Sequence, residues 1–339
     1  MKLLDLPVPS PSDSVSNAAT LQCDYEPRIH EHVAIAHERT LEWVVRMGLA
    51  PAEGPETATL NAAKFAWLAA RAYPQVTVEQ LELVSDWITF LFFYDDRCDT
   101  TQTENPAYAA ALTVTEDRLI AIGHGRMTSA PLEPLERALA DIRRRAATFA
   151  KWTWLERFGQ HFEEYVIGCR WERDLRIRGE APSLATYDRL RPLISAVPPC
   201  FDIAAMCIEG LDLAFVEHPL VQQLHIMATN HICWVNDIYG LEKELYDQTT
   251  SNLVMIVARE NGSHWGEAMQ RSIVRCNEEL TAFDRLFAIV EADANEAERA
   301  YLDALVSWLR GGLDWYSDTK RYLLPHAAGN QGITRAPAA

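Results

Sequence analysis

The sequence lacks the patterns that mark disulfide-bonded, zinc-binding and membrane-spanning proteins. Its seven cysteines are widely scattered and form no C-x-x-C pair, so neither a disulfide framework nor a thiolate zinc site is expected. No uninterrupted apolar stretch reaches the roughly 18 residues of a spanning helix. Asp5 and three prolines stand where a secretory signal would be apolar. We therefore expect a cytoplasmic protein with no membrane span.

The sequence is also poor in positive charge. It has 31 Lys and Arg residues against 48 Asp and Glu residues, which gives a formal net charge of −17. This balance argues against a general nucleic-acid binder and against a protein held electrostatically on anionic lipid. An anionic ligand would need a local group of basic side chains. With 339 residues, of which 48% are hydrophobic, the chain is long enough for a substantial core.

Strand and hairpin patterns are missing as well, whereas helical periodicity is abundant. Apolar residues recur at helical spacing near 33–48, 77–96, 131–148, 150–177, 183–209, 217–246, 263–291 and 294–323. Glycine, proline or serine interrupts this pattern and predicts breaks at 179–182, 198–199 and 262–263.

This pattern predicts the domain organisation. No internal repeat and no linker-like change of composition divides the middle of the chain. The sequence therefore predicts an all-α protein whose helices surround one cavity. We expect a flexible N-terminal arm over 1–25, one helical domain over 26–325 and a C-terminal tail over 326–339.

The strongest local feature is an apolar helix that ends in a cluster of carboxylates, at Phe92–Asp99. Asp95 and Asp99 are four residues apart and share one helix face, and Asp96 lies about 100° round from Asp95. Carboxylate oxygens at this spacing suit Mg²⁺, which often completes its shell with substrate phosphates. The alternative is a solvated helix end, although acidic residues there oppose the helix dipole.

A second polar cluster lies inside the helical stretch 217–246. Asn236, Gly240 and Glu244 follow one another at steps of four, so an amide oxygen, an open position and a carboxylate line one helix face. A further metal ion could bind there, and Lys243 could meet a phosphate oxygen as a point charge. The alternative is an ordinary charged surface helix, which the apolar residues just before Asn236 disfavour.

The sequence resembles the bacterial class I terpene synthases over most of its length. Asp95–Asp99 is similar to the aspartate-rich DDxxD motif of that family, and Asn236–Glu244 is similar to its NDxxSxxKE motif. Arg321 and Tyr322 resemble its RY pair, and the segment ending at Arg191 resembles the one that carries its diphosphate-sensing arginine. Four such patterns in the expected order are far more specific than any one alone.

The resemblance implies a fold, a chemistry and roles for these residues. The fold would be the single-domain class I terpenoid synthase bundle around a central cavity. The activity would be a Mg²⁺-dependent ionisation of a prenyl diphosphate with three metal ions. The implied metal-binding positions are Asp95, Asp96, Asp99, Asn236, Gly240 and Glu244, and the implied diphosphate donors are Arg191, Lys243, Arg321 and Tyr322. The family often forms homodimers, so a homodimer is an open expectation.

A carbocation released by ionisation needs an apolar cavity whose aromatic faces stabilise positive charge. Phe92 shares a helix face with Asp95, and Trp308 and Trp315 precede Arg321 on the last helix, so these rings are the candidates. By resemblance, a backbone carbonyl near Ser195 would also face the cation from a kinked helix, and prolines at 198–199 are expected to supply the kink.

One departure from the family pattern concerns Gly240. The family usually has serine or threonine at this position, and glycine offers no side-chain ligand, so we expect a water to take that place.

The second motif also separates the candidate functions. Chain-elongating prenyl synthases carry a second aspartate-rich motif, whereas this chain has Asn236 and Glu244, which favours cyclisation. Farnesyl diphosphate is the favoured substrate, with a sesquiterpene hydrocarbon or alcohol as product. A diterpene cyclase acting on geranylgeranyl diphosphate and a non-catalytic helical interaction protein are the alternatives.

Overall fold

The computed structural model describes residues 21–98, 105–126, 130–131, 133–247 and 249–322. Within these ranges the ordered elements are helices, so the predicted all-α fold is confirmed. They are α2 (Val33–Met47), α3 (Pro55–Ala63), α4 (Phe65–Ala72), α5 (Val78–Cys98), α6 (Pro106–Gly123), α7 (Pro134–Ala146), α8 (Trp152–Arg178), α9 (Leu184–Leu190), α10 (Val197–Met206), α11 (Leu213–Val216), α12 (Pro219–Tyr246), α13 (Leu253–Asn261), α14 (Trp265–Ala292) and α15 (Glu296–Asp318).

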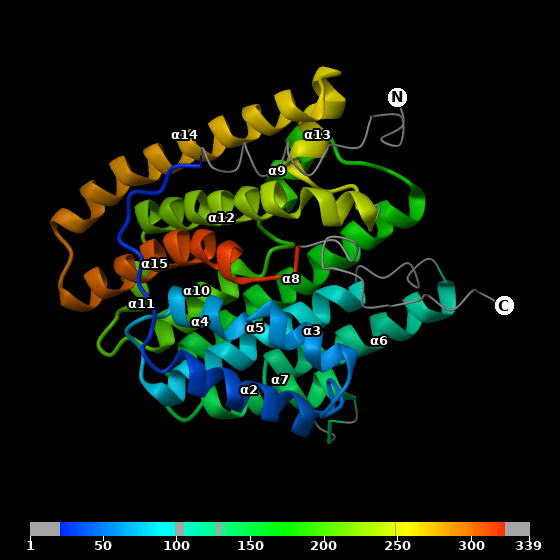
Figure 1. Ribbon diagram of the computed structural model, residues 1–339. Helices are drawn as coiled ribbons and strands as arrows, with labels where there is room; N and C mark the ends of the chain where they lie inside the picture. Colours follow the sequence, from blue (N-terminus) through cyan, green and yellow to red (C-terminus); the bar gives the residue numbers. More distant parts are fainter. Residues whose placement is uncertain (1–20, 99–104, 127–129, 132, 248, 323–339) are drawn as a thin grey trace.

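The helices pack in successive layers. Figure 1 shows α14 above α12, α12 above α15, and α4 and α5 below them, with α2 and α7 on the lower face. Helix α8 crosses behind α5 and packs against α6 and α10. The inner faces of α4, α5, α10 and α15 join in one large hydrophobic core, and α12, α13 and α14 form a second cluster of buried residues.

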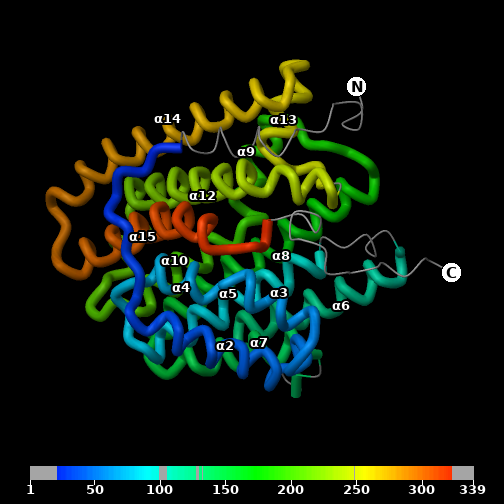
Figure 2. The backbone as a smooth tube through the Cα atoms, in the orientation of Figure 1, coloured from blue at the N-terminus to red at the C-terminus, as the bar shows by residue number. Residues whose placement is uncertain are grey.

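The described end of the chain before α2 runs along the outside of this stack (Figure 2). Of the arm expected over 1–25, residues 21–25 are described, and they lie against α14 and α15. The Cys23 carbonyl accepts a hydrogen bond from Arg310 Nη1 at 2.8 Å, and the Tyr25 hydroxyl donates to Asp284. None of the helices in the described parts of the chain is both long and apolar enough to cross a bilayer.

The helix expected over 183–209 differs from the structure. The chain is helical in α9 and again in α10, but the interruption lies at 191–196, before the two prolines. The expectation that Pro198 and Pro199 make the break was therefore wrong. Proline fits the first turn of a helix because its missing N–H needs no partner there, so these residues begin α10. The residue just before α10 is Ala196, whose backbone has a left-handed φ of 55°.

The last helix is also shorter than the predicted stretch 294–323. It ends at Asp318, and Arg321 and Tyr322 lie in the turn that follows. This turn is fixed to the end of α3, because Thr319 Oγ1 donates to the Ala63 carbonyl at 2.8 Å and the Lys320 amide donates to the Ala62 carbonyl at 3.1 Å. The two side chains are thereby turned back toward the core.

His231 is an unusual core residue of α12. It is almost fully buried, and neither ring nitrogen finds a hydrogen-bond partner among the residues that the structure describes. Burial lowers the pKa of the His231 imidazole from 6.5 to about 4, because the charged form loses its hydration. The folded protein therefore holds this side chain neutral.

This burial predicts a loss of stability in mild acid. Between the two pKa values the unfolded chain binds a proton at His231 and the folded chain does not, so stability falls as the pH drops. The free energy of unfolding, measured by urea denaturation, should fall between about pH 7 and about pH 4.5. We expect the fall to be roughly 2 kcal/mol smaller in His231→Leu than in the wild type. Ile226→Leu, at an exposed position of the same helix, changes no titratable group, so it is the control and should leave the pH dependence unchanged. Equal slopes for the wild type and His231→Leu would contradict the assignment.

Candidate active site

A cavity of about 180 Å³ lies between α4, α5, α8, α10, α12 and α15. Apolar side chains form most of its wall, among them Leu68, Ile88, Leu91, Phe92, Ile194, Val197, Ile232, Trp308 and Trp315. Its charged and polar lining includes Asp95, Glu172, Arg191, Asn236, Lys243, Glu244, Ser251, Arg321 and Tyr322. Most of these polar residues come from the last turns of α5 and α12 and from the turn after α15. The cavity thus has a polar head and an apolar chamber.

The aspartate side of the head is built at the end of α5. Asp95 lines the cavity, and Asp96, beside it, binds the Arg321 guanidinium at 2.7 Å and 3.2 Å. The nearest oxygen of Asp95 lies 3.6 Å from Arg321 Nη2. Asp99 lies outside the described residues. The carboxylates of α5 are therefore tied to the turn that follows α15.

Arg321 also stacks on the aromatic wall. Its guanidinium carbon lies 4.5 Å from the centre of the Phe92 ring and 5.8 Å from that of Phe65. Burial by itself lowers the pKa of Arg321, but the charge of Asp96 and its hydrogen bonds outweigh that effect, and the pKa is raised. This arginine stays charged at the boundary between head and chamber.

On the opposite side of the head, Asn236 of α12 is held in one orientation. Its amide nitrogen donates to the Tyr316 hydroxyl at 2.9 Å and to the Tyr322 hydroxyl at 2.8 Å. Its amide oxygen accepts a hydrogen bond from Arg191 Nη2 at 3.0 Å. The oxygen of Asn236 therefore lies on the same side as the Arg191 guanidinium.

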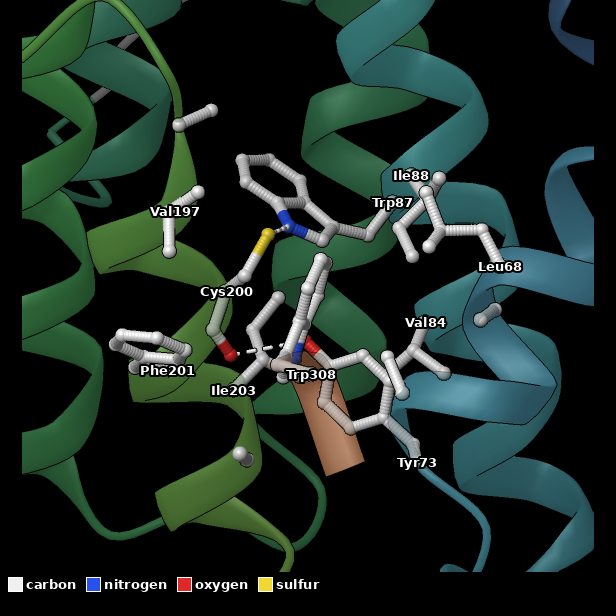
Figure 3. Close-up of a cluster of buried hydrophobic side chains, with 14 of the residues drawn as sticks. Leu68, Tyr73, Val84, Trp87, Ile88, Val197, Cys200, Phe201, Ile203 and Trp308 are labelled. Atoms are coloured by element: carbon white, nitrogen blue, oxygen red, sulfur yellow. Dashed lines mark hydrogen bonds between the residues drawn. The ribbon is translucent and has the colours of Figure 1, made fainter. Parts of the chain in front are cut away.

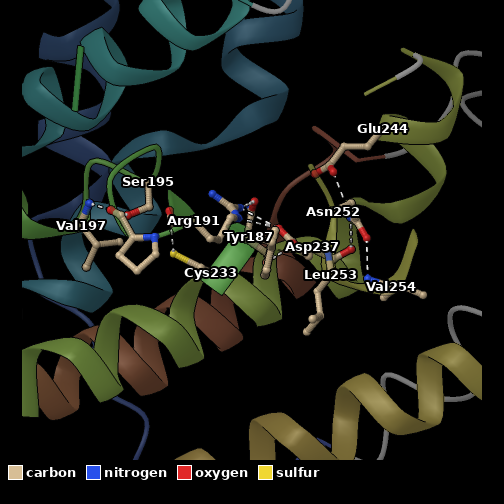
Figure 4. A network of polar contacts seen from close by, with 12 residues as sticks. Tyr187, Arg191, Ser195, Val197, Cys233, Asp237, Glu244, Asn252, Leu253 and Val254 are labelled. Atoms are coloured by element: carbon tan, nitrogen blue, oxygen red, sulfur yellow. Dashed lines mark hydrogen bonds and ion pairs between the residues drawn. The ribbon is translucent and has the colours of Figure 1, made fainter. Parts of the chain in front are cut away.

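Arg191 is fixed from behind by Asp237 (Figure 4). Its Nε and Nη2 donate to Asp237 Oδ1 at 2.9 Å and 2.7 Å, and the carboxylate is fully buried. The other oxygen, Asp237 Oδ2, accepts from the Tyr187 hydroxyl and from the Leu253 amide, the latter at 2.6 Å. Because every lone pair of this carboxylate has a donor, the buried charge pair is well satisfied.

Glu244 lies two turns beyond Asn236. Its Oε2 accepts a hydrogen bond from Asn252 Nδ2 at 2.9 Å (Figure 4). Burial, and next the charge of Asp237, raise the pKa of Glu244 to about 8. Gly240 lies beside it, and a Cβ built on Gly240 would stand 2.5 Å from Glu244 Oε1. The absence of a side chain at Gly240 is what allows the carboxylate to lie against the helix.

Lys243 lies on the cavity wall next to these groups. Its ammonium group is paired with Asp247 Oδ2 at 2.8 Å, one turn further along α12. The pair is partly exposed, so it adds little to stability. The ammonium is therefore available at the head without being buried alone.

Phe92 and Trp315 form the aromatic wall next to the head, and Phe65 packs against both of them. Phe65 stacks on Phe92 with ring centres 4.1 Å apart, and Trp315 lies 5.6 Å from Phe92. The Trp315 indole nitrogen donates to the Lys64 carbonyl at 3.0 Å. The polar edge of the indole is therefore satisfied by the backbone, and the ring packs against Phe92.

Trp308 forms part of the base of the chamber (Figure 3). It packs edge to face on Tyr73 with ring centres 5.6 Å apart, and Cys200 lies nearby on α10. Ser195 also lines the cavity, and its hydroxyl donates to the Pro192 carbonyl at 2.7 Å and accepts from the Val197 amide at 3.3 Å. This serine closes the turn that reverses the chain before α10.

The structure brings most of the sequence candidates to one cavity and adds residues that the motifs did not assign. Tyr316 and Asp237 orient Asn236 and Arg191, and Ser251 lines the head from the loop after α12. Asp237 stands next to Asn236 in the motif, and that position was the available signal. Nothing in the spacing points to Tyr316 or Ser251, because Tyr316 reaches Asn236 through the packing of α15 on α12 and Ser251 lies in a loop.

The helical fold and the cavity with its polar head and apolar chamber together define a class I terpenoid cyclase. The family model described as terpene synthase family 2, C-terminal metal binding, matches residues 86–282. The chain therefore belongs to this family of terpene synthases, and it is an enzyme of the terpene synthase type.

The relatives support the same conclusion over nearly the whole chain. One is the (+)-T-muurolol synthase ((2E,6E)-farnesyl diphosphate cyclizing) of Roseiflexus castenholzii, which is 34% identical over 91% of this chain and 94% of that protein. The germacrene A synthase of Nostoc punctiforme is 27% identical over 89% of this chain and 94% of that protein. The crystal structure of germacradien-4-ol synthase from Streptomyces citricolor superposes with a TM-score of 0.74 at 28% identity, covering 88% and 98% of the two chains.

The residues present fit the metal that this family binds. Oxygen donors of Asp95, Asn236 and Glu244 face one cavity, and the Ser251 hydroxyl there has no hydrogen-bond partner within the described ranges. In those same ranges, no three His, Cys, Asp or Glu side chains are grouped closely enough to hold a metal ion by themselves. Such a sparse oxygen set suits a hard cation that takes part of its shell from water and substrate oxygens.

The buried pair of Arg191 and Asp237 gives a direct test of how the head is held. Asp237→Asn leaves the Arg191 charge without its partner, so we expect a loss of about 3 to 5 kcal/mol in urea denaturation. Tyr187→Phe removes only one hydrogen bond to the same carboxylate and should cost about 1 kcal/mol. Equal losses in the two variants would contradict the charge-pair assignment.

Proposed function

We propose that this chain is a Mg²⁺-dependent sesquiterpene cyclase of the cytoplasm that ionises farnesyl diphosphate, cyclises the carbocation to a hydrocarbon or alcohol and releases diphosphate. The observation that carries the proposal is the cavity with a polar head joined directly to an apolar chamber with aromatic walls. The farnesyl diphosphate named for the relative from Roseiflexus castenholzii supports the choice of substrate.

The head suits a diphosphate because its basic groups converge. Arg191, Lys243 and Arg321 line the same cavity, and the Tyr322 hydroxyl lies beside them. Each can donate to the phosphate oxygens on which charge grows as the C–O bond breaks. These local cations reconcile an anionic substrate with a protein whose net charge is −17.

The metal ions belong to the same head. We propose that Asp95, Asp96 and Asp99 hold them on one side and Asn236 and Glu244 on the other, with three ions in all. When bound, Mg²⁺ supplies positive charge that stabilises the leaving diphosphate. The pairing of Arg321 with Asp96 and the hydrogen bond from Asn236 to the Tyr322 hydroxyl connect the two sides of the head through the turn after α15.

The chamber suits the cation that remains. Phe92, Trp308 and Trp315 present rings to the cavity, and their π faces attract positive charge. The apolar wall excludes water that would otherwise trap the cation.

The substrate assignment is tested with purified full-length protein and geranyl, farnesyl and geranylgeranyl diphosphates, each with Mg²⁺ and with EDTA. We expect a cyclic C15 hydrocarbon or alcohol from farnesyl diphosphate by gas chromatography with mass detection, and none with EDTA. A cyclic C20 product would transfer the assignment to a diterpene cyclase. Longer linear diphosphates as the only products would overturn cyclisation.

The metal assignment is tested at single residues. Asp95→Ala and Asn236→Ala each remove an oxygen donor from the head, so we expect turnover to fall by about 100-fold or more while helical content stays the same. Glu156→Ala changes an exposed acidic residue of α8 and serves as the control. Wild-type turnover in either head variant, with folding verified by circular dichroism, would refute the assigned role.

A further inference from the structure

The loop between α12 and α13 contributes a hydroxyl group to the head of the cavity. Ser251 is only 6% exposed, lines the cavity and finds no partner for its Oγ among the residues that the structure describes. A buried hydroxyl without a partner is unfavourable unless something else binds it. Its position therefore points to a ligand that enters the cavity.

The loop is held firmly beside Glu244. Asn252, the next residue, donates from Nδ2 to Glu244 Oε2 at 2.9 Å and to the Asp237 carbonyl at 2.8 Å. On the other side of Ser251, the Thr249 amide donates to the Glu244 carbonyl at 2.9 Å. Ser251 is thus bracketed by two residues that are hydrogen-bonded to Glu244.

The helix face that carries Asn236 and Glu244 offers no hydroxyl between them. Asn236 and Glu244 lie two turns apart on α12, and Gly240 between them has no side chain. The Glu244 carboxylate occupies the space that a side chain at Gly240 would take. A hydroxyl ligand on the Glu244 side of the head must therefore come from another segment.

We propose that Ser251 Oγ is the hydroxyl ligand of the metal ion that Asn236 and Glu244 hold, in place of the side chain missing at Gly240. The proposal rests on the proposed function, because that function supplies the metal. Serine oxygen is a hard donor of the kind that Mg²⁺ accepts.

The other unpartnered serine hydroxyls provide a comparison. Ser85 and Ser263 are also buried with no partner for Oγ within the described part of the chain. Neither of them lines the cavity. Ser251 alone in this group of three combines an unpartnered hydroxyl with a place at the head, and Ser263 offers a matched control in another buried loop position.

The first experiment measures metal binding without turnover. Mn²⁺, in the presence of inorganic diphosphate, is titrated into the full chain, and free Mn²⁺ is followed by electron paramagnetic resonance. We expect Ser251→Ala to weaken Mn²⁺ binding about tenfold or more and Ser263→Ala to leave it unchanged. Gly240→Ser in the Ser251→Ala background restores a hydroxyl on α12 and should recover most of the loss, since only the flexible end of Glu244 must move.

The second experiment tests coordination by the ligand atom itself. Ser251→Cys keeps the size of the side chain but replaces oxygen with sulfur, which favours soft metals. We expect the preference for Mg²⁺ over Cd²⁺ in diphosphate-dependent binding to fall about tenfold or more relative to wild type. Ser263→Cys controls for the added thiol. Because this variant preserves packing, it decides the proposal even where Ser251→Ala does not fold.

The outcomes separate this proposal from the proposed function. Unchanged metal affinity in Ser251→Ala, or unchanged metal preference in Ser251→Cys, would overturn the role of Ser251 and leave a water beside Gly240 as the ligand. Equal losses in Ser251→Ala and Ser263→Ala would also overturn it, because they would show a packing effect. Failure of the wild-type chain to bind Mn²⁺ with diphosphate would instead contradict the proposed function.

Discussion

The buried charge pair between Arg191 and Asp237 is the interaction on which the polar head depends. A carboxylate removed from water is costly, and only a full set of donors makes it tolerable. Asp237 receives them from Arg191, from the Tyr187 hydroxyl and from the Leu253 amide. These donors come from the end of α9 and its following turn and from the start of α13, so one charge fixes both segments against α12.

This requirement determines where the neighbouring side chains lie. Because Asp237 faces the core, Asn236 is turned about 100° away along the helix and faces the cavity. The Arg191 guanidinium bridges the two residues and presents its remaining N–H groups to the head. On the other side, Arg321 repeats the arrangement by binding Asp96 while it stacks on Phe92. Two arginines, each held by an aspartate, thus place guanidinium groups at the head of an acidic protein.

The sequence predicted the polar residues of the head much better than the segments and side chains that hold them in place. Asp95, Asn236 and Glu244 stand at regular helical spacings, so their faces could be worked out without coordinates. The break before α10 could not be placed in this way, because prolines at 198–199 fit the first turn of a helix as well as a kink. The place of Ser251 depends on how the loop before α13 folds back, and Tyr316 of α15 meets Asn236 only because α15 packs on α12. Such tertiary contacts leave no periodic trace in the sequence.

The polar groups around Cys200, at the base of the chamber, are paired with one another. The Trp87 indole nitrogen donates to Cys200 Sγ at 3.2 Å, and the Tyr73 hydroxyl donates to the Cys200 carbonyl at 2.8 Å (Figure 3). Burial raises the pKa of Cys200 to about 12, so the sulfur stays a thiol and not a nucleophilic thiolate. Because these groups satisfy one another, the base contributes shape and aromatic surface, and strong charge is confined to the head. The same helices therefore present charged groups at one end of the cavity and an apolar, aromatic surface at the other.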